Sequence, residues 1–214
     1  MSPIFKPGHL LSLLSFNSKF NLTSKCLSSF VASVGVISIV LFSFLLLEDF
    51  GDDLLASSFI GKYATIIGGN GKVIRKGSND WTCQSGNPRP FPKNGWKNVH
   101  DAMPTCHDAQ AMKWMMAYSN DTKPKLDKDG WMWMLHGDVG EDNLVPMVMN
   151  KKDATPGAWI ESGPHLMLMP KDPSSLDNYS TDFTTGAPYV MFKGTGYDHL
   201  MIPVEGYYDY QAPK

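Results

Sequence analysis

The segment Gly163-Pro164-His165-Leu166-Met167-Leu168-Met169-Pro170 decides the fold. Successive side chains of a β-strand point to opposite faces, so His165, Met167 and Met169 share one face. Proline is poorly tolerated inside a central strand, so the prolines near both ends of the segment mark where a strand begins and ends. The segment therefore predicts a short, buried strand that presents one imidazole and two thioethers on the same side.

Two other segments repeat this combination of histidine and methionine. The tripeptide His-Leu-Met recurs at 199–201, which places His199 and Met201 on one face of a second strand. In the segment 131–136 the same alternation places Met132, Met134 and His136 on one face of a third strand. Each of the three strands is thus expected to offer an imidazole and at least one thioether.

These side chains have two interpretations. Methionine is a flexible filler of apolar cores, and a histidine at a strand end is ordinarily satisfied by a hydrogen bond. Alternatively, the imidazoles and thioethers converge on a soft metal ion, of which copper as Cu(I) fits these ligands best. The spacing matches no known metal motif, and a shared face within each strand does not show that the three faces meet. The candidate copper ligands are His136, His165, His199, Met134, Met167 and Met201.

The composition indicates one folded domain, with room for an appendage. The chain has 214 residues, six tryptophans and a charged fraction of 19%, which favours a packed, sheet-rich domain over disorder. The formal net charge of −2 provides no broad basic surface, so no nucleic-acid partner is expected.

The N-terminal segment has the charge pattern of a membrane anchor. Residues 1–26 contain three lysines and no acid, residues 27–47 contain no charge, and four acidic residues follow within 48–53. About 20 apolar residues span a bilayer as a helix, and the basic flank of such a helix stays in the cytoplasm. We expect an uncleaved signal anchor. The alternative is a cleaved signal peptide, whose apolar core normally has about 7–15 residues.

This pattern divides the chain into five parts. The basic segment 1–26 and the anchor 27–47 are followed by a linker at 48–61, an exported domain at 62–206 and a tail at 207–214. The expected partner of the N-terminal helix is the membrane. The C-terminal domain is expected outside the cytoplasm, periplasmic or extracellular, and it is secreted if the leader is cleaved.

Cys83 and Cys106 are the two cysteines that follow the N-terminal segment. In an oxidising compartment two such cysteines are most simply paired, and a disulfide between them closes a long loop rich in Pro, Gly and Asn. The alternatives are a catalytic thiol, or a zinc site that includes His100 and His107. The zinc site lacks C-x-x-C-like spacing and a fourth ligand.

The remaining pattern predicts an α+β fold, mostly antiparallel sheet with one main helix and long loops. Asn70-Gly71 between apolar runs predicts a hairpin over 63–74. Apolar residues at helical spacing predict a helix over 107–118, begun by Thr105 or Asp108. Further strands are expected at 147–149 and 159–160, with a surface loop over 171–186. A final hairpin is expected from strands at 189–192 and 199–204.

With these residues in view, about residues 64–204 resemble a family of small secreted bacterial proteins of unassigned activity. The family members have a short cleaved signal, whereas this chain begins with the longer apolar segment. The resemblance implies secretion but no catalytic residue and no ligand. It is carried by Trp81-Thr82-Cys83, Cys106, Asp108, Trp114, Gly163-Pro164-His165-Leu166-Met167, Tyr189-Val190-Met191, Gly194-Thr195 and Tyr197-x-His199-Leu200-Met201-x-Pro203-Val204.

Three functions are therefore expected to compete. The first is an exported, membrane-tethered or secreted binding module with a protein or small-ligand partner. The second is a copper-binding protein that uses the candidate ligands. The third is a hydrolase with a strand-end histidine as base, although G-x-S-x-G, H-E-x-x-H and P-loop signatures are absent from the sequence. Asp198 and His199 point to opposite faces of a strand, which disfavours a direct Asp–His pair.

Overall fold

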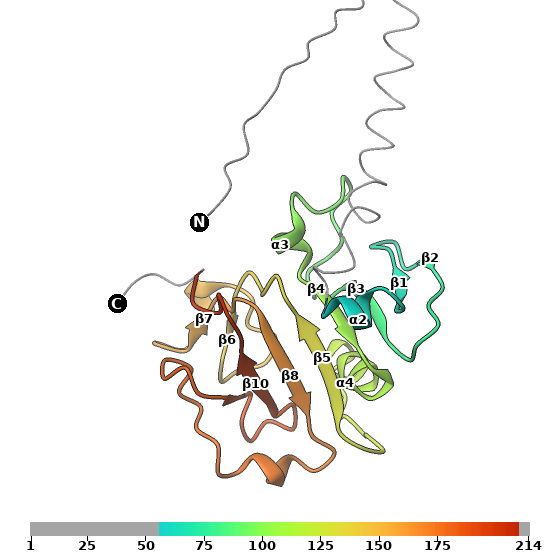
Figure 1. Cartoon of the computed structure of the whole chain (residues 1–214). Helices are drawn as coiled ribbons and strands as arrows, with labels where there is room; N and C mark the ends of the chain where they lie inside the picture. The colour runs from blue at the N-terminus through green and yellow to red at the C-terminus, as the bar shows by residue number, and fades with distance from the viewer. Residues whose placement is uncertain (1–55, 210–214) are drawn as a thin grey trace, which may run out of the picture. The chain divides into compact units, whose positions relative to one another are not determined.

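The computed structural model describes residues 56–209, and these residues form an α+β fold (Figure 1). The main sheet has eight strands in the order β2-β1-β3-β4-β5-β8-β10-β9. All neighbouring strands in it are antiparallel except β1 and β3. The strands are β1 Thr65–Ile67, β2 Val73–Arg75, β3 Thr82–Ser85, β4 Pro104–His107, β5 Gly130–Met134, β8 His165–Met169, β9 Tyr189–Met191 and β10 His199–Pro203.

Smaller elements complete the described part of the chain. A second, two-stranded antiparallel sheet pairs β6 with β7. The expected strand at 159–160 is therefore present. The expected strand at 147–149 is not, because Met147 has a positive φ of 64° in a turn. These elements are α2 Ser58–Gly61, α3 Val99–Ala102, α4 Ala109–Ser119, β6 Glu141–Asp142, β7 Trp159–Ile160 and two short 3-10 helices, η1 Lys151–Asp153 and η2 Pro173–Leu176.

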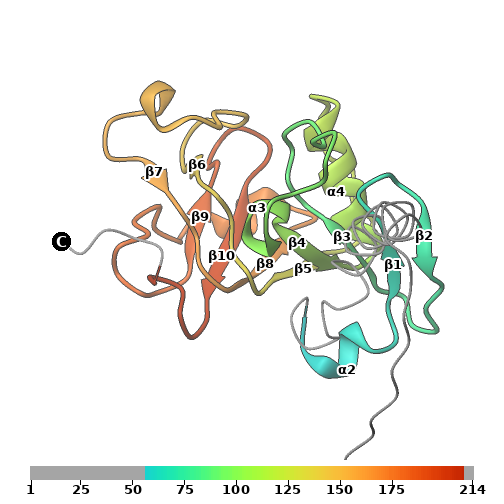
Figure 2. The same cartoon turned by 90° about the horizontal axis from the view of Figure 1, so that it is seen from above.

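The main helix, α4, is begun by Asp108, one of the two expected starting residues. The Asp108 carboxylate accepts hydrogen bonds from the backbone N–H groups of Gln110 and Ala111, which have no partner inside the helix. Thr105, the other candidate, lies in β4 instead. Figure 2 shows α4 beside the β3–β5 part of the sheet, and its closest packing is against β5. There Gly130 allows close approach, because a Cβ at that position would lie 2.5 Å from the Ala111 nitrogen.

A disulfide joins β3 to β4. Cys83 and Cys106 lie directly opposite each other in the strand register, both are fully buried, and their sulfurs are bonded across a sequence separation of 23 residues. They pack with Ala56 and Ala64 on the face of the sheet that points away from α4. The expected pairing is confirmed, and neither sulfur is available as a zinc ligand or a catalytic thiol.

The packed part of the chain extends beyond the expected domain limits at both ends. Ala56 is fully buried although it falls in the expected linker 48–61. Tyr207 is 2% exposed although it falls in the expected tail, because its ring packs in the main core cluster. Residues 1–26 and 27–47, on which the expected anchor depends, lie outside the described residues. Within 56–209 no helix is long and apolar enough to cross a bilayer.

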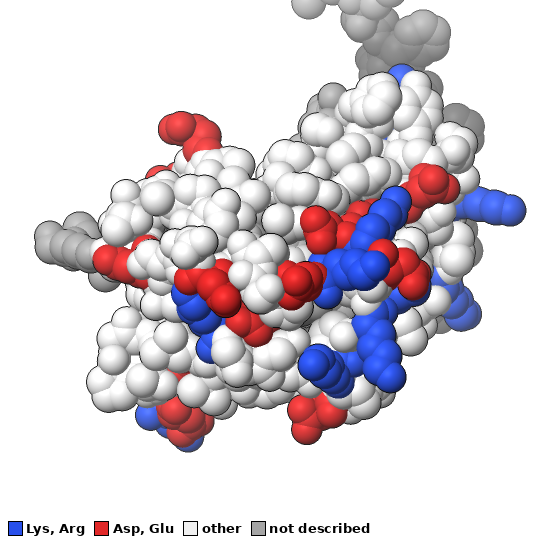
Figure 3. Space-filling model, turned by 90° about the horizontal axis from the view of Figure 1, so that it is seen from below, with Lys and Arg blue, Asp and Glu red and all other residues white. Residues whose placement is uncertain are grey.

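Charged side chains of both signs are interleaved on the face shown in Figure 3. Lys113 and Asp127, for example, form an ion pair with 2.5 Å between Nζ and Oδ2, although both side chains are largely exposed. Exposed pairs of this kind contribute little to stability. The mixture of signs on this face is in keeping with the near-neutral net charge of the chain.

Candidate functional site

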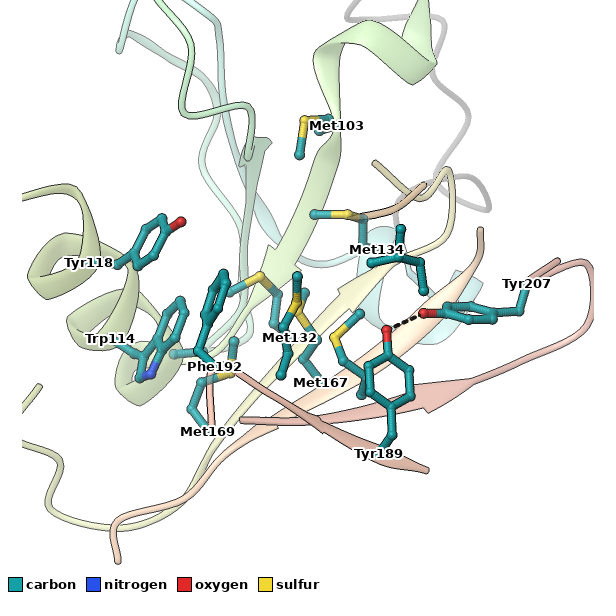
Figure 4. Packing of buried hydrophobic residues seen from close by; sticks show 14 residues of the cluster. Met103, Trp114, Tyr118, Met132, Met134, Met167, Met169, Tyr189, Phe192 and Tyr207 are labelled. Carbon is teal, nitrogen blue, oxygen red and sulfur yellow. Dashed lines mark hydrogen bonds between the residues drawn. The ribbon is translucent and has the colours of Figure 1, made fainter. Parts of the chain in front are cut away.

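A cavity of about 220 Å³ lies between the main sheet and α4. Trp114 and Tyr118 line it from the helix, and residues 84–88 line it from the end of β3 and the segment that follows. Figure 4 shows methionines of β5 and β8 directed toward the same space as the helix aromatics. Eight methionines line the cavity: Met103, Met115, Met132, Met134, Met167, Met169, Met191 and Met201.

The strand register explains why the methionines gather there. Met167 of β8 lies opposite Met132 of β5 and also opposite Met201 of β10. Residues directly opposite across neighbouring strands share a face, with Cβ atoms about 5 Å apart. Met132, Met167 and Met201 therefore form a row across three strands, and all three are almost fully buried.

The two strand histidines stand on opposite sides of this row. His165 lies opposite Met134 of β5, two residues before Met167. His199 lies opposite Met191 of β9, two residues before Met201. Because β8 and β10 are antiparallel, the two imidazoles flank the row from its two sides rather than facing each other. The cavity thus has one histidine end at His165 and another at His199.

Both imidazoles are fixed in the same tautomer by their own backbone. Nδ1 of His165 donates to the Gly163 carbonyl oxygen at 2.6 Å, and Nδ1 of His199 donates to the Tyr197 carbonyl oxygen at 3.0 Å. A carbonyl oxygen only accepts, so each Nδ1 carries the hydrogen and each Nε2 keeps a lone pair. This is the arrangement by which a second hydrogen bond orients a metal-binding imidazole.

Burial keeps both imidazoles neutral near pH 7. It lowers the pKa of His165 to about 4 and the pKa of His199 to about 4, against an ordinary value of 6.5. For the pKa of His165 this value includes the opposing effect of the hydrogen bond to Gly163 and a smaller lowering effect of His199. The Nε2 lone pairs are therefore free of protons over the physiological range.

Two carboxyl groups line the same cavity. Burial and, to a lesser extent, the charge of Asp138 raise the pKa of Glu141 to about 8, against the opposing charge of Arg89. Burial raises the pKa of Asp138 to about 6, although the backbone N–H groups of Gly140 and Ser162 donate to its carboxylate. Asp138 is thus the carboxylate that is ionised at neutral pH, whereas Glu141 is mostly protonated.

Hydrogen-bonded hydroxyl groups close the His165 end of the core. The Tyr189 and Tyr207 hydroxyls are 2.5 Å apart, and the Tyr207 hydroxyl donates to Ser162 Oγ at 3.2 Å. The Tyr207 ring also meets the His165 imidazole edge-on at 5.9 Å between centroids. These contacts explain why the chain beyond β10 folds back onto the sheet.

Five of the six candidate ligands line this cavity, and the sixth does not. Met167 and Met201 lie opposite each other in the central row, His165 lies beside Met134 on one side of this row, and His199 lies on the other side. His136 is not among the lining residues, because β5 ends at Met134 and the chain turns before His136. The backbone carbonyl of His136 instead accepts a hydrogen bond from His100 Nδ1.

Sequence reasoning missed some of the residues at the site. Met191 and Glu141 line the cavity but were not candidates. Met191 has no histidine and no second methionine in its strand, and Glu141 follows an irregular turn. Met169 was placed on the correct face without being counted as a ligand, although the period-two pattern continues through it. Within residues 56–209 no three side chains from His, Cys, Asp and Glu are grouped as a metal site.

Comparison with known proteins identified no matching family model, no similar curated protein and no similar solved structure.

Proposed function

We propose that the protein is an exported binding module that holds a small ligand in the methionine-lined cavity. The observation that carries this proposal is the cavity between the sheet and α4, which is lined by thioethers, two buried imidazoles and the carboxyl groups of Asp138 and Glu141. Ligand sites are typically concave and largely apolar, with a few oriented polar groups. The cavity has this composition.

Export is supported by two features. The Cys83–Cys106 disulfide is buried in the fold, and structural disulfides persist mainly outside reducing compartments. The uncharged segment 27–47 between a basic and an acidic flank supplies the expected anchor. A C-terminal fusion to a phosphatase that is active only after export tests this. We expect activity with the full chain and its loss when 27–47 is deleted, and an inactive full-length fusion would contradict export.

A hydrolase finds less support in the geometry. A catalytic histidine is normally oriented by a carboxylate on one nitrogen and meets a nucleophile with the other. Here the Nδ1 partners of His165 and His199 are backbone carbonyls. Asp198 instead accepts hydrogen bonds from the backbone N–H groups of Gly194 and Gly196, where it shapes the β9–β10 connection.

Xenon is a suitable probe of the proposed site, because it is polarisable and enters apolar cavities. We expect a saturable ¹²⁹Xe chemical shift with the full-length chain in a non-ionic detergent. Met167→Trp fills the cavity and should abolish the saturable part. Leu168→Trp is the matched control, because this neighbouring side chain points to the other face, and it should preserve the shift. An equal shift in both variants would place the xenon elsewhere and contradict the proposal.

A further inference from the structure

The two faces of β8 and β10 carry different kinds of side chain, and packing alone does not require this difference. On the cavity side, β8 places a histidine followed by two methionines and β10 places a histidine followed by a methionine. Leucine and methionine exchange in cores at low cost, so filling space does not choose between them. The selection of thioethers on only one side therefore indicates a chemical use for sulfur there. The opposite face of these two strands carries Leu166, Leu168, Leu200 and Ile202.

His199 has the densest surroundings of thioethers. Met191 lies directly opposite it on β9, and the register that pairs Leu200 with Leu168 places Met169 of β8 opposite it on the other side. Met201 follows two residues later on the same face. Directly opposite residues have Cβ atoms about 5 Å apart, and the flexible methionine side chain lets its sulfur reach a point above the imidazole.

Aromatic rings pack against His199 at this end of the cavity. The Trp114 and His199 rings meet at 4.9 Å between centroids, and the Phe192 and His199 rings at 5.5 Å. His199 is 3% exposed, and its Nδ1 is held by the Tyr197 carbonyl oxygen. The remaining ring nitrogen, Nε2, is thus left as a donor on an oriented, buried imidazole.

We propose that this cavity binds one Cu(I) ion, held by Nε2 of His199 and by the thioethers of Met169, Met191 and Met201. Thioether and imidazole ligands suit Cu(I), whereas Mg²⁺ and Ca²⁺ require oxygen donors. The inference rests on the proposed function, of which it names the ligand. It also places the ion beside His199 and not beside His165, because the two imidazoles stand on opposite sides of the Met132–Met167–Met201 row.

Anaerobic titration with Cu(I) tests the proposal, using the full-length chain in a non-ionic detergent and a chromophoric Cu(I) chelator as competitor. We expect one tight site. His199→Ala should weaken it about a hundredfold, in line with losses seen when metal-site residues are removed. The matched control is His165→Ala, which removes an equally buried imidazole from the other end and should leave the affinity within about threefold.

A second pair of variants guards against loss of the fold. Met169→Leu with Met191→Leu conserves side-chain volume, so the protein should fold while the affinity falls at least about tenfold. Met132→Leu, on the same face but in β5, should change it little. Equal weakening by His165→Ala and His199→Ala, or no weakening by the Met169/Met191 double change, would overturn the proposal. Saturable xenon binding without a tight Cu(I) site would overturn the metal assignment alone and leave the binding cavity in place.

Discussion

Removal of the disulfide should destabilise the protein by an amount that follows from its position in the chain. Cys83 and Cys106 enclose a loop with a sequence separation of 23 residues. In the chain-entropy model, closing such a loop removes about 11 cal/mol/K from the unfolded state, which corresponds to about 3 kcal/mol at 25 °C. For a domain of this size, 1 kcal/mol lowers the melting temperature by about 2–4 °C, so Cys83→Ala with Cys106→Ala should lower it by about 10 °C.

The measurement is urea unfolding of the full-length chain in a non-ionic detergent, followed by tryptophan fluorescence. The matched control is Cys26→Ala, which removes the third cysteine outside the pair and should leave the unfolding midpoint unchanged. Reduction of the wild-type chain under denaturing conditions should reproduce the effect of the double variant. A loss below about 1 kcal/mol, or an equal loss in the Cys26 variant, would refute the assignment of this bond as the main covalent restraint.

Three further outcomes follow from the structure. Asp108→Ala removes the carboxylate that accepts hydrogen bonds from the Gln110, Ala111 and Trp131 N–H groups, so it should lower the free energy of unfolding by about 2 kcal/mol in urea. Asp108→Asn should retain part of this stabilisation, and an unchanged unfolding midpoint in the alanine variant would contradict the role of Asp108 as the helix cap. The pKa of Glu141 rises from 4.5 to about 8 on folding, so the native state keeps a proton that the unfolded chain releases, and stability should fall as the pH rises toward 8. Glu141→Gln should flatten this fall in thermal melts from pH 5 to 9, and an unaltered slope would exclude the group. Deletion of residues 1–55 should leave a soluble domain with the wild-type fluorescence spectrum, whereas a product that only aggregates would show that the described part cannot fold alone.

Local pattern predicted much of the fold. The strands around His165 and His199, the hairpin at Asn70-Gly71 and the disulfide partners all follow from short-range chemistry. Period-two alternation fixes the face of a side chain because it depends only on neighbouring residues. The α+β class with one main helix is confirmed on this basis.

The assembly of the site required information that no single segment contains. Strand register determines which methionines lie opposite each histidine, and it depends on pairing between segments far apart in the chain. The turn after Met134 moves His136 out of the strand, although the alternating sequence continues through that residue. Glu141 lines the cavity from β6, a strand of two residues that is too short to show a period in the sequence.

The most direct test is X-ray absorption at the copper edge of the full-length chain loaded with one Cu(I) equivalent. A methionine cavity that holds the metal at its His199 end predicts a coordination shell dominated by sulfur with one imidazole nitrogen. The sulfur contribution should fall in the Met169→Leu, Met191→Leu variant and persist in Met132→Leu. A shell of nitrogen and oxygen alone, or one that is identical in all three proteins, would contradict the cavity as the metal site.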